Sequence, residues 1–253
     1  LWELAQLRGQ NPRLLQFRAQ PYVALSDRLL WNRTSEAYGY VLLSRSGRAL
    51  LFDYGYDLNP GLAGGADRAA RRPWLASLPA LRSQFGVSGI DAVVPTHYHD
   101  DHVAGINLLR AVEGAELWAA SSFADILARP ARYNLPCLWY DPIPVDRALP
   151  LGVPIQWHEH SFTLHPLPGH TRYAVAIELE VDGRRVLIGG DQYHGDDGLG
   201  LNYVYHNGFA PDDYVASAAL YSRLAPELIL SGHWAPLEPP PGYADELARR
   251  GVA

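Results

Sequence analysis

A cluster of metal-binding side chains restricts the folds open to this chain: His97, His99, Asp101 and His102 lie within six residues. The cluster follows an apolar run over residues 90–94, which is typical of a buried strand, and precedes a segment with helical spacing. Residues two apart in an extended segment point to the same side, so His97 and His99 are able to share one cation. Asp101 and His102, at the start of the expected helix, are placed to reach a second cation.

Simpler interpretations exist for each member of this loop. Asp100 is interpreted as the N-cap of the following helix rather than as a ligand, because Asp is a favoured capping residue. A single His often serves as a partly buried hydrogen-bonding residue. The four other residues together favour metal binding over four independent structural roles.

The composition indicates a compact water-soluble protein. Of 253 residues, 48% are hydrophobic and 19% are charged, and the net charge is −6. An acidic chain without a basic stripe does not suit nucleic acid, so a small molecule is the expected partner. No apolar run is long enough for a membrane span or a signal peptide, which favours a cytoplasmic location. The chain has no Met, even at position 1, so we expect it to begin inside a longer reading frame.

Catalysis by a nucleophilic side chain finds no support in the sequence. The G-x-S-x-G motif of serine hydrolases does not occur. The single Cys, Cys137, lies in a Pro-flanked loop, far along the chain from the His cluster, and has no second Cys at C-x-x-C spacing.

Turn residues and hydrophobic periodicity divide the chain into two β-rich halves, each followed by helices. We expect an extension over residues 1–20 and one folded domain over residues 21–253. The expected strands are 22–25, 38–43, 49–52, 90–94, 155–157, 162–167, 174–181, 185–190 and 227–230; the expected helices are 73–85, 106–110, 123–127, 212–224 and 243–250. The Pro-rich region 130–154 is expected to be a surface loop. This order suggests two sheets packed face to face with helices outside.

Four further motifs accompany the His cluster, and with them the chain resembles the metallo-β-lactamase superfamily of metallo-hydrolases. They are Asp53-Tyr54-Gly55, Pro168-Gly169-His170-Thr171, Gly189-Gly190-Asp191 and Ser231-Gly232-His233. They are similar to the superfamily's early Asp-x-Gly, its P-G-H-T ligand loop, its bridging Asp and its final His ligand. The resemblance implies an α/β fold, the four-layer αββα sandwich, with a site where the strand-end loops meet.

The resemblance also implies two metal sites that share one ligand. One ion would be held by His97, His99 and His170, the other by Asp101, His102 and His233, and Asp191 would bridge both. Imidazole and carboxylate donors suit two divalent ions, with zinc as first choice and iron or manganese as alternatives.

Other polar residues near the motifs receive supporting roles. Asp53 is expected to orient a ligand through hydrogen bonds. His194 and His206 are candidate catalytic proton donors to a leaving group, and Asp101 is a candidate for proton uptake. Substrate contacts are expected from residues 192–207 and from Tyr54, Tyr56 and Trp234, with packing of the Tyr residues against the sheet edge as an equal alternative. The strand residues His158, His160 and His165 are interpreted as structural.

The resemblance implies a hydrolase in which a hydroxide bridging two metals attacks a small carbonyl substrate: an ester, lactone, thioester or amide. Common dizinc β-lactamases carry Cys where Asp191 stands, which disfavours antibiotic hydrolysis. About 20 residues follow His233, fewer than glyoxalase II relatives use to bind glutathione, which disfavours a glutathione thioester.

Two alternatives stay open. The same site would also suit a β-lactam, a phosphodiester or a sulfate ester. The chain would instead be a non-catalytic metal-binding module of a larger protein if its metal served only structure. Seven donors favour an enzyme, because a structural site normally closes at four ligands. The oligomeric state is not determined by the sequence.

Overall fold

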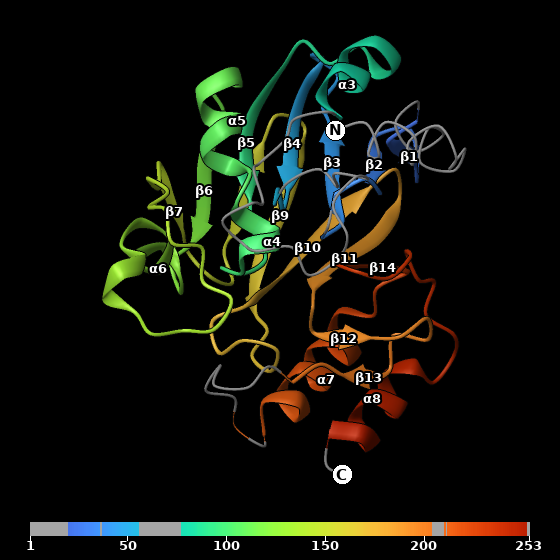
Figure 1. The fold of residues 1–253 in the computed structure, drawn as a ribbon. Coiled ribbons are helices and arrows are strands. Elements are labelled where there is room, and N and C mark those ends of the chain that lie inside the picture. The colour runs from blue at the N-terminus through green and yellow to red at the C-terminus, as the bar shows by residue number, and fades with distance from the viewer. Residues whose placement is uncertain (1–19, 36, 56–76, 204–209, 211, 252–253) are drawn as a thin grey trace, which may run out of the picture.

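The structure is a computed structural model that describes residues 20–35, 37–55, 77–203, 210 and 212–251 (Figure 1). The predicted extension over residues 1–20 lies outside the described residues except for Gln20, as do Tyr56, His206 and the start of the helix predicted from residue 73. In the described part, no helix is long and apolar enough to cross a bilayer.

The first half of the chain forms a seven-stranded mixed sheet in the order β1-β2-β3-β4-β5-β6-β7. Its strands are β1 (Tyr22–Ala24), β2 (Leu29–Asn32), β3 (Gly39–Leu43), β4 (Arg48–Phe52), β5 (Gly89–Val94), β6 (Glu116–Ala120) and β7 (Arg147–Leu149). The pairs from β1 to β4 are antiparallel, and those from β4 to β7 are parallel. The carboxyl ends of β4 and β5 therefore meet at one edge.

The second half forms a five-stranded sheet in the order β14-β11-β10-β9-β8. Its strands are β8 (Pro154–Trp157), β9 (His160–Pro166), β10 (Val175–Val181), β11 (Arg184–Gly190) and β14 (Leu228–Ser231). Because β11 and β14 run parallel, their carboxyl ends also meet at one edge. A small hairpin of β12 (Tyr193–His194) and β13 (Gly200–Leu201) follows β11.

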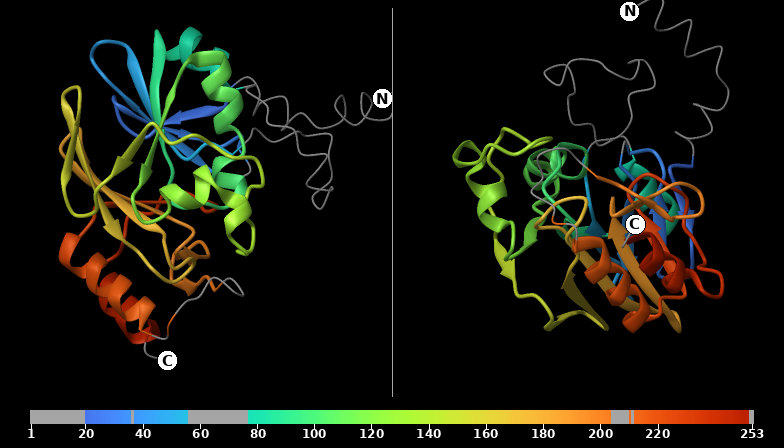
Figure 2. Two further views of the ribbon diagram at one scale, coloured as in Figure 1. Left: turned by 90° about the vertical axis from the view of Figure 1, so that its left-hand side faces the viewer. Right: turned by 90° about the horizontal axis from the view of Figure 1, so that it is seen from below.

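Helices cover the outer faces of both sheets, so the molecule has four layers (Figure 2). On the first sheet lie α3 (Leu78–Phe85), α4 (Asp100–Val103), α5 (Ile106–Glu113) and α6 (Ala124–Ala128); on the second lie α7 (Asp213–Leu224) and α8 (Tyr243–Gly251). This arrangement confirms the predicted αββα fold.

Strand alternation assigns the apolar side chains of the second sheet to two cores. Val186 and Ile188 of β11 belong to the large core that also contains residues of the first sheet, whereas Leu187 between them packs with α7 and α8. Successive side chains of a strand point to opposite faces, so one apolar run serves both layers. Across the main core, the rings of Phe52 and Phe162 meet edge to face with centroids 6.0 Å apart.

Most predicted elements are confirmed, and three differences have a local cause. Strand β2 was missed because its four residues follow a turn-like Ser-Asp pair, and β7 lies inside the region 130–154 predicted as loop. Both are short, which leaves little periodicity to detect.

Asp100 is the first residue of α4 rather than its N-cap, which is His99. An acidic residue is favourable in the first turn as well, where it faces the positive end of the helix dipole.

The two sheets are joined, toward the start of β5, by the carboxylate of Asp91. It forms an ion pair with Arg48 at 2.6 Å and accepts hydrogen bonds from Trp157 Nε1 and His158 Nε2, both at 3.0 Å. Burial alone would raise the pKa of Asp91, but the hydrogen bonds from His158, Arg48 and Trp157 hold it below its ordinary value. Asp91 thus connects the first sheet to the end of β8 in the second.

We expect Asp91→Asn to lower the free energy of unfolding by about 1 kcal/mol at pH 7, since the pair is partly exposed. The pKa of Asp91 is lower in the folded protein than in the unfolded chain. Its contribution to the free energy of unfolding is therefore present above the ordinary carboxyl pKa of about 3.9 and is lost as the pH falls below that value. Urea unfolding of both proteins, free of metal, at pH 7 and below pH 4 measures the difference. A difference that grew with acid would contradict the assignment.

Candidate metal centre

The donor residues predicted from the five motifs follow the carboxyl ends of strands at one edge of the sandwich. His97 lies after β5, His170 after β9, Asp191 after β11 and His233 after β14. Two hydrogen bonds hold the sheets together here: Tyr40 Oη donates to the Ser231 carbonyl at 2.6 Å, and Val175 N donates to the Thr96 carbonyl at 2.9 Å. Loops far apart in the sequence therefore converge.

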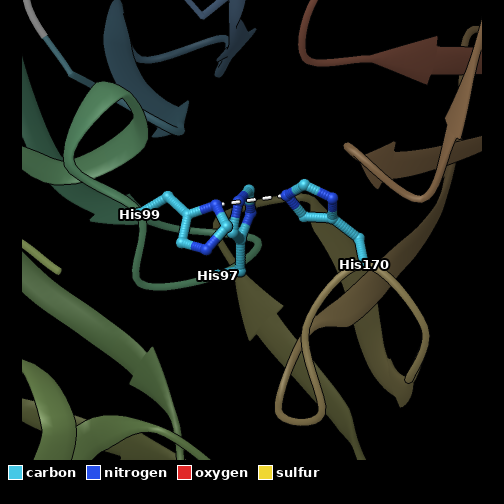
Figure 3. Close-up of side chains that lie close together, drawn as sticks. All are labelled: His97, His99 and His170. Atoms are coloured by element: carbon cyan, nitrogen blue, oxygen red, sulfur yellow. Dashed lines mark hydrogen bonds between the residues drawn. The ribbon is translucent and has the colours of Figure 1, made fainter. Parts of the chain in front are cut away.

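The first group of donors consists of His97, His99 and His170. One ring nitrogen from each lies within 4.8 Å of the other two, and all three side chains are buried. Figure 3 shows the rings pointing toward one another, with His99 Nδ1 and His170 Nε2 3.1 Å apart. Three imidazoles with nitrogens at this spacing are able to hold one metal ion.

The second group of donors consists of Asp101, His102, Asp191 and His233, whose ligand atoms also lie within 4.8 Å of one another. His233 Nε2 lies 3.1 Å from Asp101 Oδ2 and 3.1 Å from Asp191 Oδ2. His102 Nε2 lies 3.2 Å from Asp191 Oδ1. Two carboxylates and two imidazoles thus face a common point.

Asp191 lies between the two groups. Besides its contacts with His102 and His233, its Oδ2 lies 3.6 Å from His170 Nε2 of the first group. All seven predicted donors are therefore brought together, with one carboxylate next to both sets. This geometry is the one that a ligand shared by two ions requires.

Hydrogen bonds on the far side of three rings set which nitrogen faces the site. His97 Nδ1 lies 3.0 Å from Thr96 Oγ1, His102 Nδ1 lies 2.9 Å from Asp53 Oδ2, and His170 Nδ1 lies 3.0 Å from the carbonyl of Asn202. Asp53 also accepts bonds from the Thr96 amide and hydroxyl, at 2.6 and 2.9 Å. Each Nε2 is thereby left to face the other donors, as metal-binding His residues require.

Three buried polar atoms test whether this cluster fits a metal. His97 Nε2 makes no hydrogen bond to any described residue. His102 Nε2 and Asp191 Oδ1 lie 3.2 Å apart as an ion pair and have no other partner among the described residues. A buried polar atom without a partner is costly, and most such atoms in folded proteins are satisfied. A metal ion would satisfy His97 Nε2 and would take the place of the proton between the other two atoms, so the residues fit a site for metal ions.

The two groups differ in charge state in the metal-free protein. Burial lowers the pKa of His97 and His170, and it lowers that of His99 to about 3, so these rings are neutral and ready to bind a metal. Burial would also lower the pKa of His102, but the carboxylates of Asp191, Asp101 and Asp53 together raise it well above its ordinary value.

His233 behaves like His102. Burial disfavours its charged form, yet hydrogen bonds with Asp101 and Asp191 raise its pKa to about 10. The pKa values of both carboxyl groups are correspondingly low, despite burial, because the two His residues lie beside them. The second group thus holds protons between its members, and a metal ion that binds there displaces them.

The site is more open on the side of the second group. The side chain of His233 is 30% exposed and that of Asp101 is 18% exposed, whereas that of His102 is fully buried. Solvent therefore reaches the donors at Asp101 and His233.

Close packing explains the glycines beside two donors. A side chain at Gly232 would collide with Asp191 Oδ1 and with the ring of His102. Gly190 has a φ of 53°, a conformation that favours glycine, and a side chain there would meet Thr96. The glycines in the motifs thus allow the loops to approach one another.

Several other predicted residues lie outside the two groups. His194 is exposed; its ring lies 5.7 Å from that of Trp234, which in turn lies 5.9 Å from His233. Its role as a proton donor stays a prediction, as does that of His206, which is outside the described residues. Tyr54 is buried in the main core, so the prediction that it contacts substrate is not supported.

Cys137 was expected to be remote from the site, but its carbonyl accepts a hydrogen bond from the Asp100 amide at 2.8 Å. Sequence distance did not predict this contact, although neither donor group contains the residue. His158 Nε2, His160 Nε2 and His165 Nε2 lie within hydrogen-bonding distance of Asp91, the Leu43 carbonyl and Glu178, in agreement with their structural interpretation.

Sequence reasoning gave Thr96 no role and expected Gln192 and Asn202, within residues 192–207, to contact substrate, whereas all three contact donor residues. Thr96 and Gln192 directly precede and follow a predicted ligand, and this adjacency was the available signal. Asn202 had no comparable signal, because it lies 32 residues from the His170 ring that it contacts.

A sequence model of the metallo-beta-lactamase superfamily matches residues 39–233, a range that includes all seven donors. The chain therefore belongs to the metallo-beta-lactamase superfamily.

Two curated relatives are hydroxyacylglutathione hydrolases. The protein of Fuscovulum blasticum is 28% identical over 142 residues, which are 56% of this chain and 47% of the relative. That of Pseudomonas putida (strain W619) is 27% identical over 125 residues, 49% of this chain and 39% of the relative. The matched part thus spans less than half of the length of either relative.

Solved metallo-beta-lactamases share the fold at low sequence identity. The enzyme BJP-1 of Bradyrhizobium japonicum, of subclass B3, superposes with a TM-score of 0.63 at 20% identity, covering 92% of this chain and 90% of that one. The metallo-beta-lactamase of Pontibacter korlensis has a TM-score of 0.66 at 15% identity, covering 91% and 97%. The class B3 di-zinc enzyme LRA-12, from an Alaskan soil metagenome, has a TM-score of 0.62 at 16% identity, covering 93% and 90%.

Proposed function

We propose that this protein is a dinuclear hydrolase that cleaves small carbonyl substrates: esters, lactones, thioesters or amides. The observation that carries the proposal is the arrangement of seven nitrogen and oxygen donors in two adjoining groups with Asp191 beside both. A structural metal site closes at four ligands and has no need of a second ion. The arrangement therefore supports catalysis rather than a purely structural role.

In this proposal His97, His99 and His170 hold one ion, Asp101, His102 and His233 hold the other, and Asp191 contacts both. Two divalent ions, when bound, lower the pKa of a water molecule between them from about 15.7 toward 7 and thus supply a nucleophile at neutral pH. Of the possible ions, zinc suits this mixture of imidazole and carboxylate donors, and the di-zinc neighbour LRA-12 agrees with that choice. Iron and manganese suit it too.

Asp101 is the residue placed to move a proton. It is the more exposed of the two carboxylates in the second group, with 18% of its side chain exposed against 6% for Asp191. A carboxylate is able to accept a proton when it is ionised. His194 and His206 stay candidates for donating a proton to the leaving group.

The charge of the chain favours a neutral or partly apolar substrate over a multiply charged phosphate. The net charge is −6. The similarity to hydroxyacylglutathione hydrolases supports a thioester within this class, in contrast to the expectation from the sequence, which disfavoured a glutathione thioester. The fold shared with β-lactamases makes a β-lactam the second substrate to test.

A metal and substrate panel tests the proposal. Metal-free protein would be loaded separately with Zn²⁺, Fe²⁺ or Mn²⁺ and assayed with an acylglutathione, an aryl ester, a lactone, a chromogenic β-lactam and an aryl phosphodiester. We expect about two equivalents of metal and metal-dependent cleavage of at least one carbonyl substrate. One tightly bound equivalent with no turnover on any substrate would instead identify a structural module.

Asp53→Asn is expected to lower the affinity for the ion at His102 by about 10–100-fold, because an amide cannot provide the charged acceptor that now faces both His102 Nδ1 and Thr96. Zinc affinity measured by competition with a chromophoric chelator checks the prediction. Asp27→Ala, at an exposed position, is the control. Equal affinities of Asp53→Asn and the wild type would show that Asp53 does not support the site.

A further inference from the structure

Gln192, the residue directly after Asp191, is almost completely buried and uses both ends of its side-chain amide in hydrogen bonds. Its Oε1 accepts a bond from the His170 backbone amide at 3.2 Å. Its Nε2 donates to the Pro168 carbonyl at 2.8 Å and to Ser217 Oγ at 2.9 Å. Ser217 Oγ in turn donates to the same Pro168 carbonyl at 2.8 Å. Both N–H donors of the amide are therefore used, together with one of the two lone pairs of its oxygen.

These bonds hold both ends of the short turn that carries His170. Pro168 and His170 are tied to Gln192, while Gly169 between them has a φ of 143°, a conformation that favours glycine. A side chain at Gly169 would collide with Gln192 Nε2 and press on Tyr214 of α7. The turn is thus enclosed by Gln192 on one side and by α7 on another.

The connection also joins the two donor groups. Gln192 and Asp191 are neighbours in the chain, so the segment that places the carboxylate between the groups also places the backbone of His170 in the first group. Asn202 reinforces this link: its carbonyl lies 3.0 Å from His170 Nδ1, and its side chain donates to the Asp191 carbonyl at 2.7 Å. His170 is therefore held at its backbone by Gln192 and at its ring by Asn202.

We propose that Gln192, anchored to α7 by Ser217, is a positioning residue that sets the distance of His170 from Asp191 and so controls metal binding by His97, His99 and His170. This inference rests on the proposed dinuclear site. Asp101, His102 and His233 make no hydrogen bond to Gln192 in the described part of the chain, so the second ion depends on it much less.

The selective loss of one ion tests the proposal. Gln192→Leu keeps a side chain of similar volume but lacks all three hydrogen bonds. We expect it to weaken Zn²⁺ binding at the first donor group by about 10–100-fold and to leave Zn²⁺ binding at the second donor group nearly unchanged. Zn²⁺ titration against a chromophoric chelator measures both affinities, and Co²⁺ absorption reports the geometry of each site. Gln156→Leu, at an exposed Gln of β8 that bonds only the His158 carbonyl, is the matched control.

A milder variant keeps the test informative if Gln192→Leu does not fold. Ser217→Ala leaves the bonds of Gln192 to His170 and Pro168 in place but removes its anchor on α7, so its affinity for the first ion should lie between those of the wild type and Gln192→Leu. In metal-free protein, hydrogen exchange at the His170 amide should accelerate in Gln192→Leu and much less in Ser217→Ala.

The outcomes separate this inference from the proposed function. If Gln192→Leu and Ser217→Ala lower both affinities equally, or neither, or leave His170 amide exchange unchanged, the positioning role is wrong while the dinuclear hydrolase stands. If the wild type binds fewer than two ions, the proposed function and the inference built on it both fail. Two ions, selective loss of the first and no turnover would overturn only the hydrolase.

Discussion

Replacing Asp191 with Ala is expected to remove both metal ions, not one, and to lower hydrolysis by more than about 100-fold. Loss of a residue that merely supports a ligand costs about 10–100-fold in metal affinity or activity, and loss of a ligand shared by two ions should cost more. Asp191 lies within 3.6 Å of His170 in the first group and within 3.2 Å of His102 and His233 in the second. Elemental analysis of dialysed protein and steady-state rates measure the two effects.

The control for this experiment is Asp27→Ala, which removes an exposed carboxylate and should leave metal content and rate unchanged. Circular dichroism establishes that Asp191→Ala is folded before its metal content is interpreted. Retention of two ions by the folded variant would show that Asp191 does not contact both. Retention of one ion would show that Asp191 contacts only one of the two ions and that the other donor group binds its ion without Asp191.

Removal of the metal is expected to lower Tm by about 8–16 °C for each ion bound. One ion present at a thousand times its dissociation constant stabilises the folded state by about 4 kcal/mol. In a domain of this size, 1 kcal/mol corresponds to about 2–4 °C. The physical reason is that a metal would give the buried His97 Nε2 a partner and would take the place of the proton between His102 Nε2 and Asp191 Oδ1.

Thermal unfolding with excess Zn²⁺ and with a chelator measures this shift. Asp191→Ala should show a much smaller difference between the two conditions, because it has little metal to lose. Equal Tm values of the wild type in both conditions would mean that the donors are held in place without metal, and that the three buried atoms are satisfied in another way.

Sequence and structure agree best where the information is local. The spacing of His97, His99, Asp101 and His102 along one loop is sufficient to predict donors for two ions, because a strand end and a helix start orient neighbouring side chains. The hairpin of β10 and β11 is equally local: Asp182 and Gly183 both have positive φ, as a tight turn between two strands requires.

Agreement ends where contacts join residues that are distant in sequence. The sequence places Tyr54 next to Asp53 and suggested a substrate contact, yet Tyr54 is buried in the main core. Cys137 appears remote, yet its carbonyl bonds the Asp100 amide. In both cases the sequence determines the residue type, whereas packing of other elements against it determines the environment.

The sequence by itself determined which residues are available as donors, that they follow strand ends, and the αββα class that such an order favours. The resemblance implied that Asp191 lies beside both groups, whereas the tertiary structure alone decided that Asp53 faces His102 and that Gln192 holds His170. Periodicity and turn chemistry act over a few residues, while the contact of Asp53 with His102 joins positions 49 residues apart. The geometry of such contacts depends on how two sheets pack, and no local pattern encodes it.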